Sequence, residues 1–490
     1  MITRFRKLPG RIPAGLIAAG LLTMLALARF NQSLWSDEAS SLWFSRQPIG
    51  ALLTSLCDPH PPGYYLLLKA WTLFGTGEAW LRLPSLLAAL GTLALTYRIA
   101  RAHSGATGAM LAAVLLALQP LQSWYASEVR MYALVECVGL LAVWLGWRLI
   151  DRDAKIGPWL AYALAAGLSI WLDYTALLPL AVLQLIWIAR GCPLWRPWLG
   201  LHIVMAVLLG SWWLTGGQLS SPVRSYQPIF IAIQAARLGL DLTPAAAASL
   251  LQWAALGAIG GSLLIAWYAQ RHTLLNSKAW QLIGVGIWAG LLAFSAAPAV
   301  FTLKRLLVVG VPYVVLGAAV IVARWPRKFQ LASVVLRAVA ALIALLTFQR
   351  EPWRALVYDL ATQNQATTIW VDELSVPVFD YYWSQFAPDD TRRWAPLINR
   401  AWPTFPAVTP APAGSLSIVT EETPYRRLIA LLPDEFWAEY QLMADQRSSS
   451  LVAYQFTRRL QPIDSPPRPD RVPADEWGLL LPSPLDTCTR

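Results

Sequence analysis

Long apolar runs recur along roughly the first 350 residues and constrain the fold more than any other feature of the sequence. Most of them have about the 17–25 residues that a helix needs to cross the hydrocarbon core of a bilayer. We expect eleven spans, at residues 12–28, 84–100, 106–121, 131–149, 158–172, 175–189, 198–214, 246–269, 279–296, 306–323 and 331–348. The sequence therefore predicts an all-α polytopic membrane protein in this part of the chain.

The basic residues set the predicted orientation of these spans. The net charge of +11 by itself suggests a nucleic-acid partner, but Lys and Arg stand in short clusters between the apolar runs. Such clusters mark cytoplasmic loops. Counting them places the N-terminus in the cytoplasm, and we predict no nucleic-acid partner. The first run is expected to remain as a span because Arg29-Phe30-Asn31 does not resemble a signal-peptide cleavage site.

One apolar run is expected to lie on the membrane rather than cross it. The run from Pro61 to Trp71 is short, and Lys69 interrupts it. Treating it as a span would also reverse every later loop and place the basic clusters outside. We therefore predict an interfacial helix, with its Tyr and Trp rings at headgroup level, inside an outer loop at 29–83.

The composition changes after Phe348. Residues 349–490 are polar and rich in Pro, with strand-like runs at 368–371 and 417–419 and a helical pattern at 353–361. This mixture favours a small C-terminal extracytoplasmic α/β domain that ends in a Pro-rich tail. The predicted domains are thus a transmembrane module at 1–348 and an outer domain at 349–490. Four cysteines show no metal spacing, and a Cys57–Cys488 disulfide on the outer side is one open alternative.

An acidic pair, Asp37-Glu38, follows the first apolar run between Trp35 and Trp43. One interpretation is structural, because acids in a first helical turn cap the helix and complement its dipole. The other is catalytic, because a carboxylate in a half-dry site at a membrane surface can take a proton from an acceptor hydroxyl. We predict Asp37 as a general base, with Glu38 as its catalytic neighbour.

The next polar stretch surrounds His60. Pro61 and Pro62 end one element and begin the interfacial helix, so His60 has an ordinary structural interpretation. An alternative is that Glu38, Asp58 and His60 hold a divalent metal. We predict no cofactor and assign no metal, and a divalent metal at these residues stays an open alternative.

Cations on the predicted outer side are candidates for binding phosphate. Arg130 is preceded by Glu128, which could orient it, and the adjacent pair Lys304-Arg305 runs against the positive-inside trend. Each has the alternative role of an interface anchor, yet a guanidinium fork suits a phosphate and cations stabilise a phosphate leaving group. Two further candidates for the same role are Lys69 and Arg224.

Taken in order, these motifs resemble the glycosyltransferase C superfamily, specifically bacterial relatives of dolichyl-phosphate-mannose–protein mannosyltransferase and of the lipid A aminoarabinose transferase. The matching stretches are Asp37-Glu38, His60-Pro61-Pro62-Gly63-Tyr64-Tyr65, Leu81-Arg82-Leu83-Pro84-Ser85, Ser127-Glu128-Val129-Arg130-Met131-Tyr132, Lys304-Arg305 with Pro312, and Trp353-Arg354. They cover most of the chain up to about Asp359 and are most specific in the first 150 residues.

The resemblance implies an inverting enzyme that takes a sugar from a polyprenyl-phosphate donor on the outer face of the membrane. Asp37 matches the family's catalytic Asp, Arg130 its outer-loop Arg near the lipid phosphate, and Arg305 its basic position before span ten. Relatives commonly place Tyr after that last position, whereas this chain has Leu306, so Lys304 is a possible substitute. The matching motif also makes His60 and Tyr64 candidate substrate contacts.

The predicted function is therefore sugar transfer from a polyprenyl phosphate to a hydroxyl of a glycan, a lipid or a protein, in a bacterial plasma (inner) membrane. A lipid-linked sugar transporter or flippase is the main alternative, but it would need ionisable residues deep in the spans. Only Glu136 and Arg337 lie there in the predicted spans. A non-enzymatic scaffold whose outer domain binds cell-wall polymer is a third possibility.

Overall fold

The computed structural model describes residues 14–54, 58, 60–150, 156–189, 192, 194–215, 303–347, 349–363, 368–371, 375–388, 393–396, 415–421, 440–448 and 451–458. Contacts divide the chain into two compact units. We call the first the helical unit; it comprises Met1–Asn31, His60–Thr215 and Tyr226–Phe348. The second, the C-terminal unit, comprises Gln32–Pro59, Gly216–Ser225 and Gln349–Arg490.

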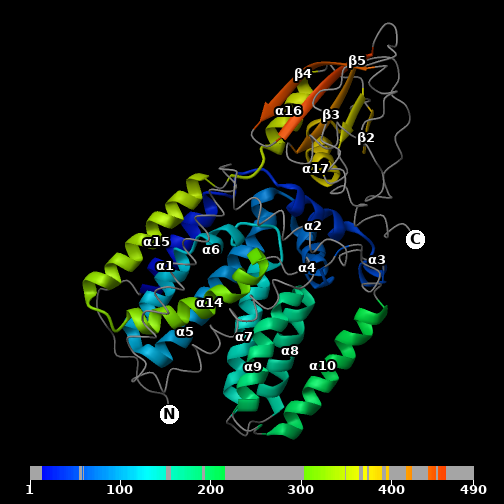
Figure 1. The fold of residues 1–490 in the computed structure, drawn as a ribbon. Coiled ribbons are helices and arrows are strands. Elements are labelled where there is room, and N and C mark those ends of the chain that lie inside the picture. The colour runs from blue at the N-terminus through cyan, green and yellow to red at the C-terminus, as the bar shows by residue number, and fades with distance from the viewer. Residues whose placement is uncertain are drawn as a thin grey trace, which may run out of the picture. The chain divides into compact units, whose positions relative to one another are not determined.

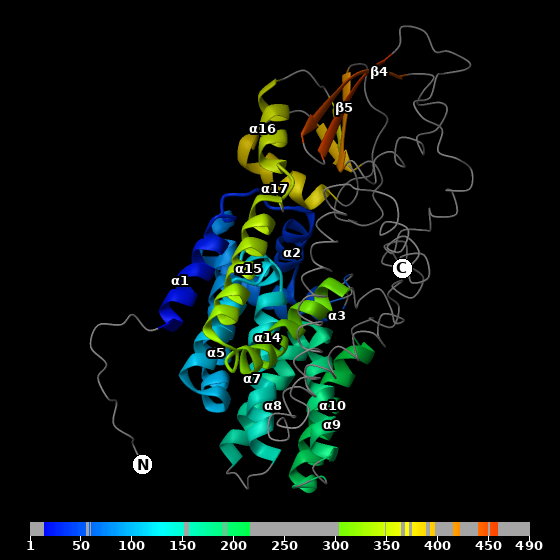
Figure 2. The same ribbon diagram turned by 60° about the vertical axis from the view of Figure 1, so that its left-hand side comes forward.

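The helical unit contains ten described α-helices and two short 3-10 turns. They are α1 (Ala14–Leu27), α4 (Gly63–Trp71), η1 (Thr72–Phe74), α5 (Glu78–Ala117), α6 (Pro120–Tyr125), α7 (Tyr132–Ile150), α8 (Ile156–Leu172), η2 (Tyr174–Ala176), α9 (Leu177–Ala189), α10 (Trp195–Thr215), α14 (Leu303–Val322) and α15 (Arg327–Thr347). Helices α7, α8 and α9 lie side by side, as Figures 1 and 2 show.

Most predicted spans coincide with a helix. Helices α1, α7, α8, α9, α10, α14 and α15 begin and end within a few residues of the expected bounds. Within the described ranges, α5, α7 and residues Arg327–Leu346 of α15 are long and apolar enough to cross a membrane by length and composition. The predicted interfacial run forms α4, whose nine residues are too few to span a bilayer. The spans expected at 246–269 and 279–296 lie outside the described residues.

The region of the second and third predicted spans differs from expectation. Helix α5 runs through both of them and is interrupted at Gly105, whose φ of 68° and ψ of −164° are not helical. Positive φ is accessible to Gly without steric cost, which explains a break at this residue. The third span is also shorter than predicted, because the helix ends at Ala117 and Pro120 starts the separate helix α6. Part of the segment between the third and fourth predicted spans is thus helical.

Two arginines in the helical unit, one buried and one half-buried, bind carbonyl groups at the C-terminal ends of helices. Arg337 of α15 donates to the backbone oxygen of Leu115 in the last turn of α5, at 3.2 Å. Arg29 donates to the oxygen of Ala344 in the last turn of α15, also at 3.2 Å. These carbonyls lack an intrahelical donor and carry the negative end of the helix dipole. Arg337, one of the ionisable residues noted within the predicted spans, thus donates to backbone.

The C-terminal unit combines helices from both ends of the chain with a mixed sheet. Its helices are α2 (Ser36–Arg46), α3 (Ile49–Thr54), α16 (Trp353–Gln363) and α17 (Val376–Phe386), and its strands are β1 (Thr368–Val371), β2 (Arg393–Pro396), β3 (Ser415–Glu421), β4 (Tyr440–Ser448) and β5 (Leu451–Arg458). The strand order is β2-β1-β3-β5-β4. Strand β1 pairs in parallel with β2 and β3, whereas β5 pairs antiparallel with β3 and β4.

The predicted strands at 368–371 and 417–419 fall within β1 and β3, and the predicted helix at 353–361 falls within α16. In β1, Ile369 and Val371 are fully buried on one face. The segment Gln32–Pro59 groups with the C-terminal residues rather than with the membrane helices. The domain boundary at 348 stays a prediction.

Candidate active site

The acidic pair lies in the first turn of α2. Trp35 is the residue before the helix and has extended backbone angles, and Ser36, Asp37 and Glu38 form the first turn. The Glu38 carboxylate accepts a hydrogen bond from the backbone N–H of Trp35 at 3.3 Å. A glutamate at this third position commonly reaches back in this way, and its charge complements the helix dipole. Glu38 thus makes the contact that the capping interpretation expects, and its catalytic role stays a prediction.

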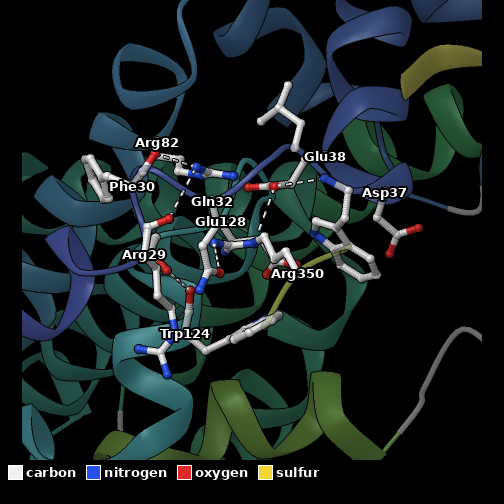
Figure 3. Close-up of polar contacts among 12 residues, drawn as sticks. Arg29, Phe30, Gln32, Asp37, Glu38, Arg82, Trp124, Glu128 and Arg350 are labelled. Atoms are coloured by element: carbon white, nitrogen blue, oxygen red, sulfur yellow. Dashed lines mark hydrogen bonds and ion pairs between the residues drawn. The ribbon is translucent and has the colours of Figure 1, made fainter. Parts of the chain in front are cut away.

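Glu38 has a second partner, which lies just after α15 in the sequence. Its Oε2 atom lies 3.4 Å from Nε of Arg350, and both side chains have 0% exposure. The Arg350 guanidinium also donates to the side-chain oxygen of Gln32 at 3.5 Å, and Gln32 in turn donates to Gln349 at 2.6 Å. Figure 3 shows the Glu38 carboxylate beside Arg350. Burying this carboxylate requires such a partner, because an unpaired buried charge is very costly.

Further hydrogen bonds attach the segment before α2 to the C-terminal residues. The Ser33 hydroxyl accepts from the backbone N–H of Arg354 at 3.1 Å. The N–H of Leu34 donates to the hydroxyl of Tyr382 in α17 at 2.6 Å. Trp353, which begins α16, is fully buried. The chain segment that leads into the acidic pair is therefore held by residues between 349 and 382. No sequence pattern indicated these contacts.

Asp37 has a different environment from Glu38. Glu38 is fully buried, whereas Asp37 is half-buried. Neighbouring residues on a helix point about 100° apart, so one turn can bury one carboxylate and present the next. In Figure 3 the Asp37 carboxylate points away from the Glu38–Arg350 pair. The two acids thus differ in what they can do: Glu38 is bound by the protein, and Asp37 lies at the surface of the turn.

A third carboxyl group, Glu351, lies within electrostatic range of this pair. Burial raises its pKa, and the charges of Asp37 and Glu38 raise it further, while its own backbone and Arg350 act in the opposite direction. We call Asp37, Glu38, Arg350 and Glu351 the acidic-turn cluster. The sequence analysis did not single out Arg350 or Glu351, although both directly follow the last predicted span and so fall on the predicted outer side.

The helical unit holds a second polar cluster, which we call the histidine cluster: His60, Arg130 and Asp173. The Nδ1 atom of His60 lies 2.9 Å from Oδ2 of Asp173, and both side chains are almost completely buried. The Nε2 atom of His60 lies 3.3 Å from a terminal guanidinium nitrogen of Arg130. The structure therefore brings together His60 and Arg130, two of the predicted site residues. Asp173 falls in the two-residue gap between the spans expected at 158–172 and 175–189, and no sequence pattern indicated its contact with His60.

Two residues of α5, one turn apart, donate hydrogen bonds to backbone carbonyls of neighbouring segments. Arg82 donates to the carbonyl of Phe30, just beyond α1, at 2.8 Å. The Ser85 hydroxyl donates to the carbonyl of Glu128 at 2.5 Å and contacts that of Arg130 at 3.5 Å. All of these side chains are buried. Arg82 and Ser85 belong to the predicted motif at 81–85, and their contacts give that motif a structural role.

The remaining predicted residues are placed as follows. Tyr64 is buried in α4, and Lys69 is half-buried in the last turn of that helix. Lys304 and Arg305 lie in the first turn of α14 rather than in the expected loop, because the helix begins before the apolar run that marks the span. Arg224 lies outside the described residues. Among the described residues, no group of three or more His, Cys, Asp or Glu side chains could hold a metal ion.

Part of the sequence matches a known protein family. A family model described as dolichyl-phosphate-mannose-protein mannosyltransferase matches residues 59–214. No curated protein matches the sequence significantly. That family match includes His60, Arg130 and Asp173, so the whole histidine cluster lies inside it.

Solved structures share the fold. ArnT from Cupriavidus metallidurans bound to undecaprenyl phosphate has 17% identity and a TM-score of 0.56, covering 90% of this chain and 97% of that chain. The same protein in the apo state has 16% identity and a TM-score of 0.54 over the same shares. The Archaeoglobus fulgidus oligosaccharyltransferase in complex with Zn and sulfate has 11% identity and a TM-score of 0.51, covering 90% of this chain and 72% of that chain.

Identities this low show a shared fold, and the family model adds a sequence relationship over residues 59–214. The motif around His60 and Arg130 lies within the family match. Residues 59–214 are therefore similar in sequence to the dolichyl-phosphate-mannose-protein mannosyltransferase family, and the chain shares the fold of ArnT and of the Archaeoglobus fulgidus oligosaccharyltransferase.

Proposed function

We propose that this chain is a membrane glycosyltransferase that moves a sugar from a polyprenyl-phosphate donor to an acceptor hydroxyl, with inversion at the sugar. The family match over residues 59–214 supports the transfer chemistry, and the ArnT structure that shares the fold is bound to undecaprenyl phosphate. The proposed location is a plasma membrane, with the N-terminus in the cytoplasm and the acidic turn on the outer side.

One observation carries the proposal: two adjacent carboxylates occupy different environments. Glu38 is fully buried and bound to Arg350 and the Trp35 N–H. Asp37 is half-buried and points away from that pair. A general base must reach the hydroxyl proton that it removes, and only Asp37 is placed at the surface of the turn. The geometry favours Asp37 as the base and Glu38 as the residue that fixes the turn.

In the proposed reaction, Asp37 takes the proton of the acceptor hydroxyl. The acceptor oxygen forms a bond to the anomeric carbon of the sugar, and the bond from that carbon to the phosphate oxygen breaks. The electron pair leaves with the polyprenyl phosphate. Arg130 is proposed to stabilise that phosphate, because a guanidinium offers several planar donors to phosphate oxygens. Lys304 and Arg305 are proposed to add positive charge for the same leaving group.

The proposal is tested with purified protein in detergent and a panel of undecaprenyl-phosphate-linked, radiolabelled monosaccharides. A membrane extract supplies acceptors. We expect label to move from one donor into acceptor material, with release of an equal amount of undecaprenyl phosphate. A transporter would leave the sugar–phosphate bond intact, and absence of transfer from every donor would reject the proposal.

The phosphate role of Arg130 has a separate test. Arg130→Ala is expected to weaken binding of undecaprenyl phosphate, because the side chain proposed to contact it is gone. Arg148, exposed near the other end of α7 with its guanidinium 5.1 Å from the Trp144 ring, gives a matched control. Arg148→Ala should bind as the wild type does. Equal affinity of the two variants would remove Arg130 from the proposed site.

A further inference from the structure

Three buried side chains of the histidine cluster form a linear series of hydrogen bonds. Asp173 Oδ2 and His60 Nδ1 lie 2.9 Å apart, and His60 Nε2 and the Arg130 guanidinium lie 3.3 Å apart. The exposed fractions of His60, Arg130 and Asp173 are 1%, 4% and 1%. At this burial, the position of each proton strongly affects the energy of the network.

The chemistry of arginine fixes where the His60 proton lies. A guanidinium only donates, so His60 Nε2 must accept from Arg130 and carry no proton. The neutral ring then has its proton on Nδ1, which donates to Asp173. The other carboxylate oxygen of Asp173 accepts from the backbone N–H of Thr175 at 2.8 Å. Both oxygens of Asp173 therefore act as acceptors.

The electrostatics of Asp173 indicate a carboxylate that is ionised in the folded protein. Burial by itself raises the pKa of Asp173, but its contacts with His60 and Thr175 outweigh that effect. The pKa of Asp173 is consequently held below its ordinary value. An ionised acceptor is what the Nδ1 proton of His60 requires.

The backbone around the cluster is also closely fitted. Gly63 begins α4, and a Cβ atom added there would overlap the backbone oxygen of Trp171 near the end of α8. This approach brings the segment that starts with His60 against the segment that carries Asp173. Ser85 holds the carbonyl of Arg130 from α5. The positions of all three residues are therefore set by the packing of α4, α5 and α8.

We infer that Asp173 is a positioning residue: it fixes the His60 tautomer that accepts from Arg130, and so holds the Arg130 guanidinium in the orientation that binds the donor phosphate. The inference rests on the proposed function for the role of Arg130. Carboxylates often act on histidine in this way. The carboxylate accepts from one ring nitrogen, and the other ring nitrogen is then unprotonated and can bind a third group.

Asp173→Asn is the discriminating change because it conserves shape and alters only donors and acceptors. The Thr175 N–H needs an acceptor, so the oxygen of Asn takes the Oδ1 position and its NH₂ takes the Oδ2 position. That NH₂ donates to His60 Nδ1, which moves the ring proton to Nε2. Two donors, His60 Nε2–H and Arg130, then face each other, and Arg130 loses His60 as an acceptor.

His60→Gln supplies the conservative comparison. A glutamine amide has one donor and one acceptor, so its NH₂ can donate to Asp173 while its oxygen accepts from Arg130. We expect this variant to keep most of the Arg130 orientation, whereas His60→Ala loses it. His202 is the matched control, since its Nε2 lies 3.0 Å from the Tyr162 hydroxyl in a separate network. His202→Gln should leave phosphate binding unchanged.

The first measurement is ¹⁵N NMR of histidine-labelled protein, which reports the protonated ring nitrogen. The chain has four histidines, so the His60→Gln spectrum assigns the His60 signal. We expect an Nδ1–H ring in the wild type and an Nε2–H ring in Asp173→Asn. An unchanged tautomer in Asp173→Asn would overturn the inference, whatever the activity of the protein.

The second measurement is binding of undecaprenyl phosphate and the KM for the donor. Asp173→Asn and His60→Ala should each weaken both by about tenfold or more, as loss of one hydrogen bond to a charged group does. His60→Gln should lose less affinity than His60→Ala, and His202→Gln should stay close to the wild type. Wild-type affinity in a folded Asp173→Asn protein would contradict the inference. Absence of sugar transfer by the wild type would instead reject the proposed function, and the NMR result would still stand.

Discussion

The Glu38 carboxylate lies 3.4 Å from the Nε atom of Arg350, and neither side chain is exposed. One residue precedes nearly all of the membrane helices in sequence, and the other follows the last of them. The acidic turn is therefore held by a residue that lies more than half the chain away in sequence. It also leaves the neighbouring Asp37 as the carboxylate at the surface of that turn.

Removing one partner of this pair should destabilise the protein strongly. Glu38→Gln or Arg350→Met leaves an uncompensated buried charge, at a cost of about 3–5 kcal/mol. The double variant Glu38→Gln/Arg350→Met should recover part of that loss, because neither charge remains. Denaturant unfolding in detergent measures the coupling. Additive losses in the double variant would show that the two side chains do not interact energetically.

Gly63 should not tolerate a methyl group. A Cβ at this position would overlap the carbonyl of Trp171, and backbone atoms cannot move aside as a flexible side chain can. Gly63→Ala is expected to cost about 1–3 kcal/mol, as overpacking of a tight core does. Gly157→Ala is the matched control, since nothing lies within 4 Å of a Cβ there, in the same helix as Trp171. Equal melting temperatures of the two variants would contradict the packing account.

The local elements could be predicted because they depend on neighbouring residues. Apolar runs of sufficient length predicted α1, α7 and α15, and a short run of β-branched and aromatic residues predicted β1. The start of α14 was placed too late, since the first turn of a helix need not be apolar. The break at Gly105 fell between two predicted spans, where a basic cluster had suggested a loop.

Partners that meet only in the folded chain could not be predicted in this way. The pattern around Glu38 indicates a helix cap, but nothing local indicates that Arg350 completes it. Asp173 showed the same limitation: a polar residue between two apolar runs predicts a turn, whereas its contact with His60 depends on how α4 packs on α8. The motif at 81–85 was noticed, yet its role in holding Phe30 and Glu128 required the structure.

Glu351 should make stability depend on pH in a defined direction. Burial, with repulsion by Asp37 and Glu38, raises the pKa of Glu351 in the folded protein above its ordinary value. The folded state therefore binds this proton more tightly than the unfolded state does. Its contribution is fully present below the unfolded pKa and is lost as pH rises through the folded pKa. The neutral variant Glu351→Gln avoids that loss.

Melting temperatures of wild type and Glu351→Gln, compared between about pH 4 and about pH 8, check this expectation. The two proteins should melt alike at the acidic end, where Glu351 is protonated. The melting temperature of the variant should rise relative to that of the wild type as pH increases. A difference that stays constant with pH, or that grows toward acid, would show that Glu351 is not destabilised by ionisation.

The central claim is that Asp37 removes the acceptor proton. Asp37→Asn keeps the size of the side chain but cannot act as the base, so the transfer rate should fall by about 10²–10⁴-fold. The fold and the binding of undecaprenyl phosphate should persist, because Glu38 and Arg350 still hold the turn. Glu78, half-buried in the first turn of α5, provides a control of the same kind.

The most direct measurement is the single-turnover rate of sugar transfer from undecaprenyl phosphate by wild type, Asp37→Asn and Glu78→Gln. All three proteins are first matched for melting temperature and lipid-phosphate affinity. The account predicts that Glu78→Gln transfers sugar at the wild-type rate and that Asp37→Asn transfers almost none. Transfer by Asp37→Asn at the wild-type rate would contradict it.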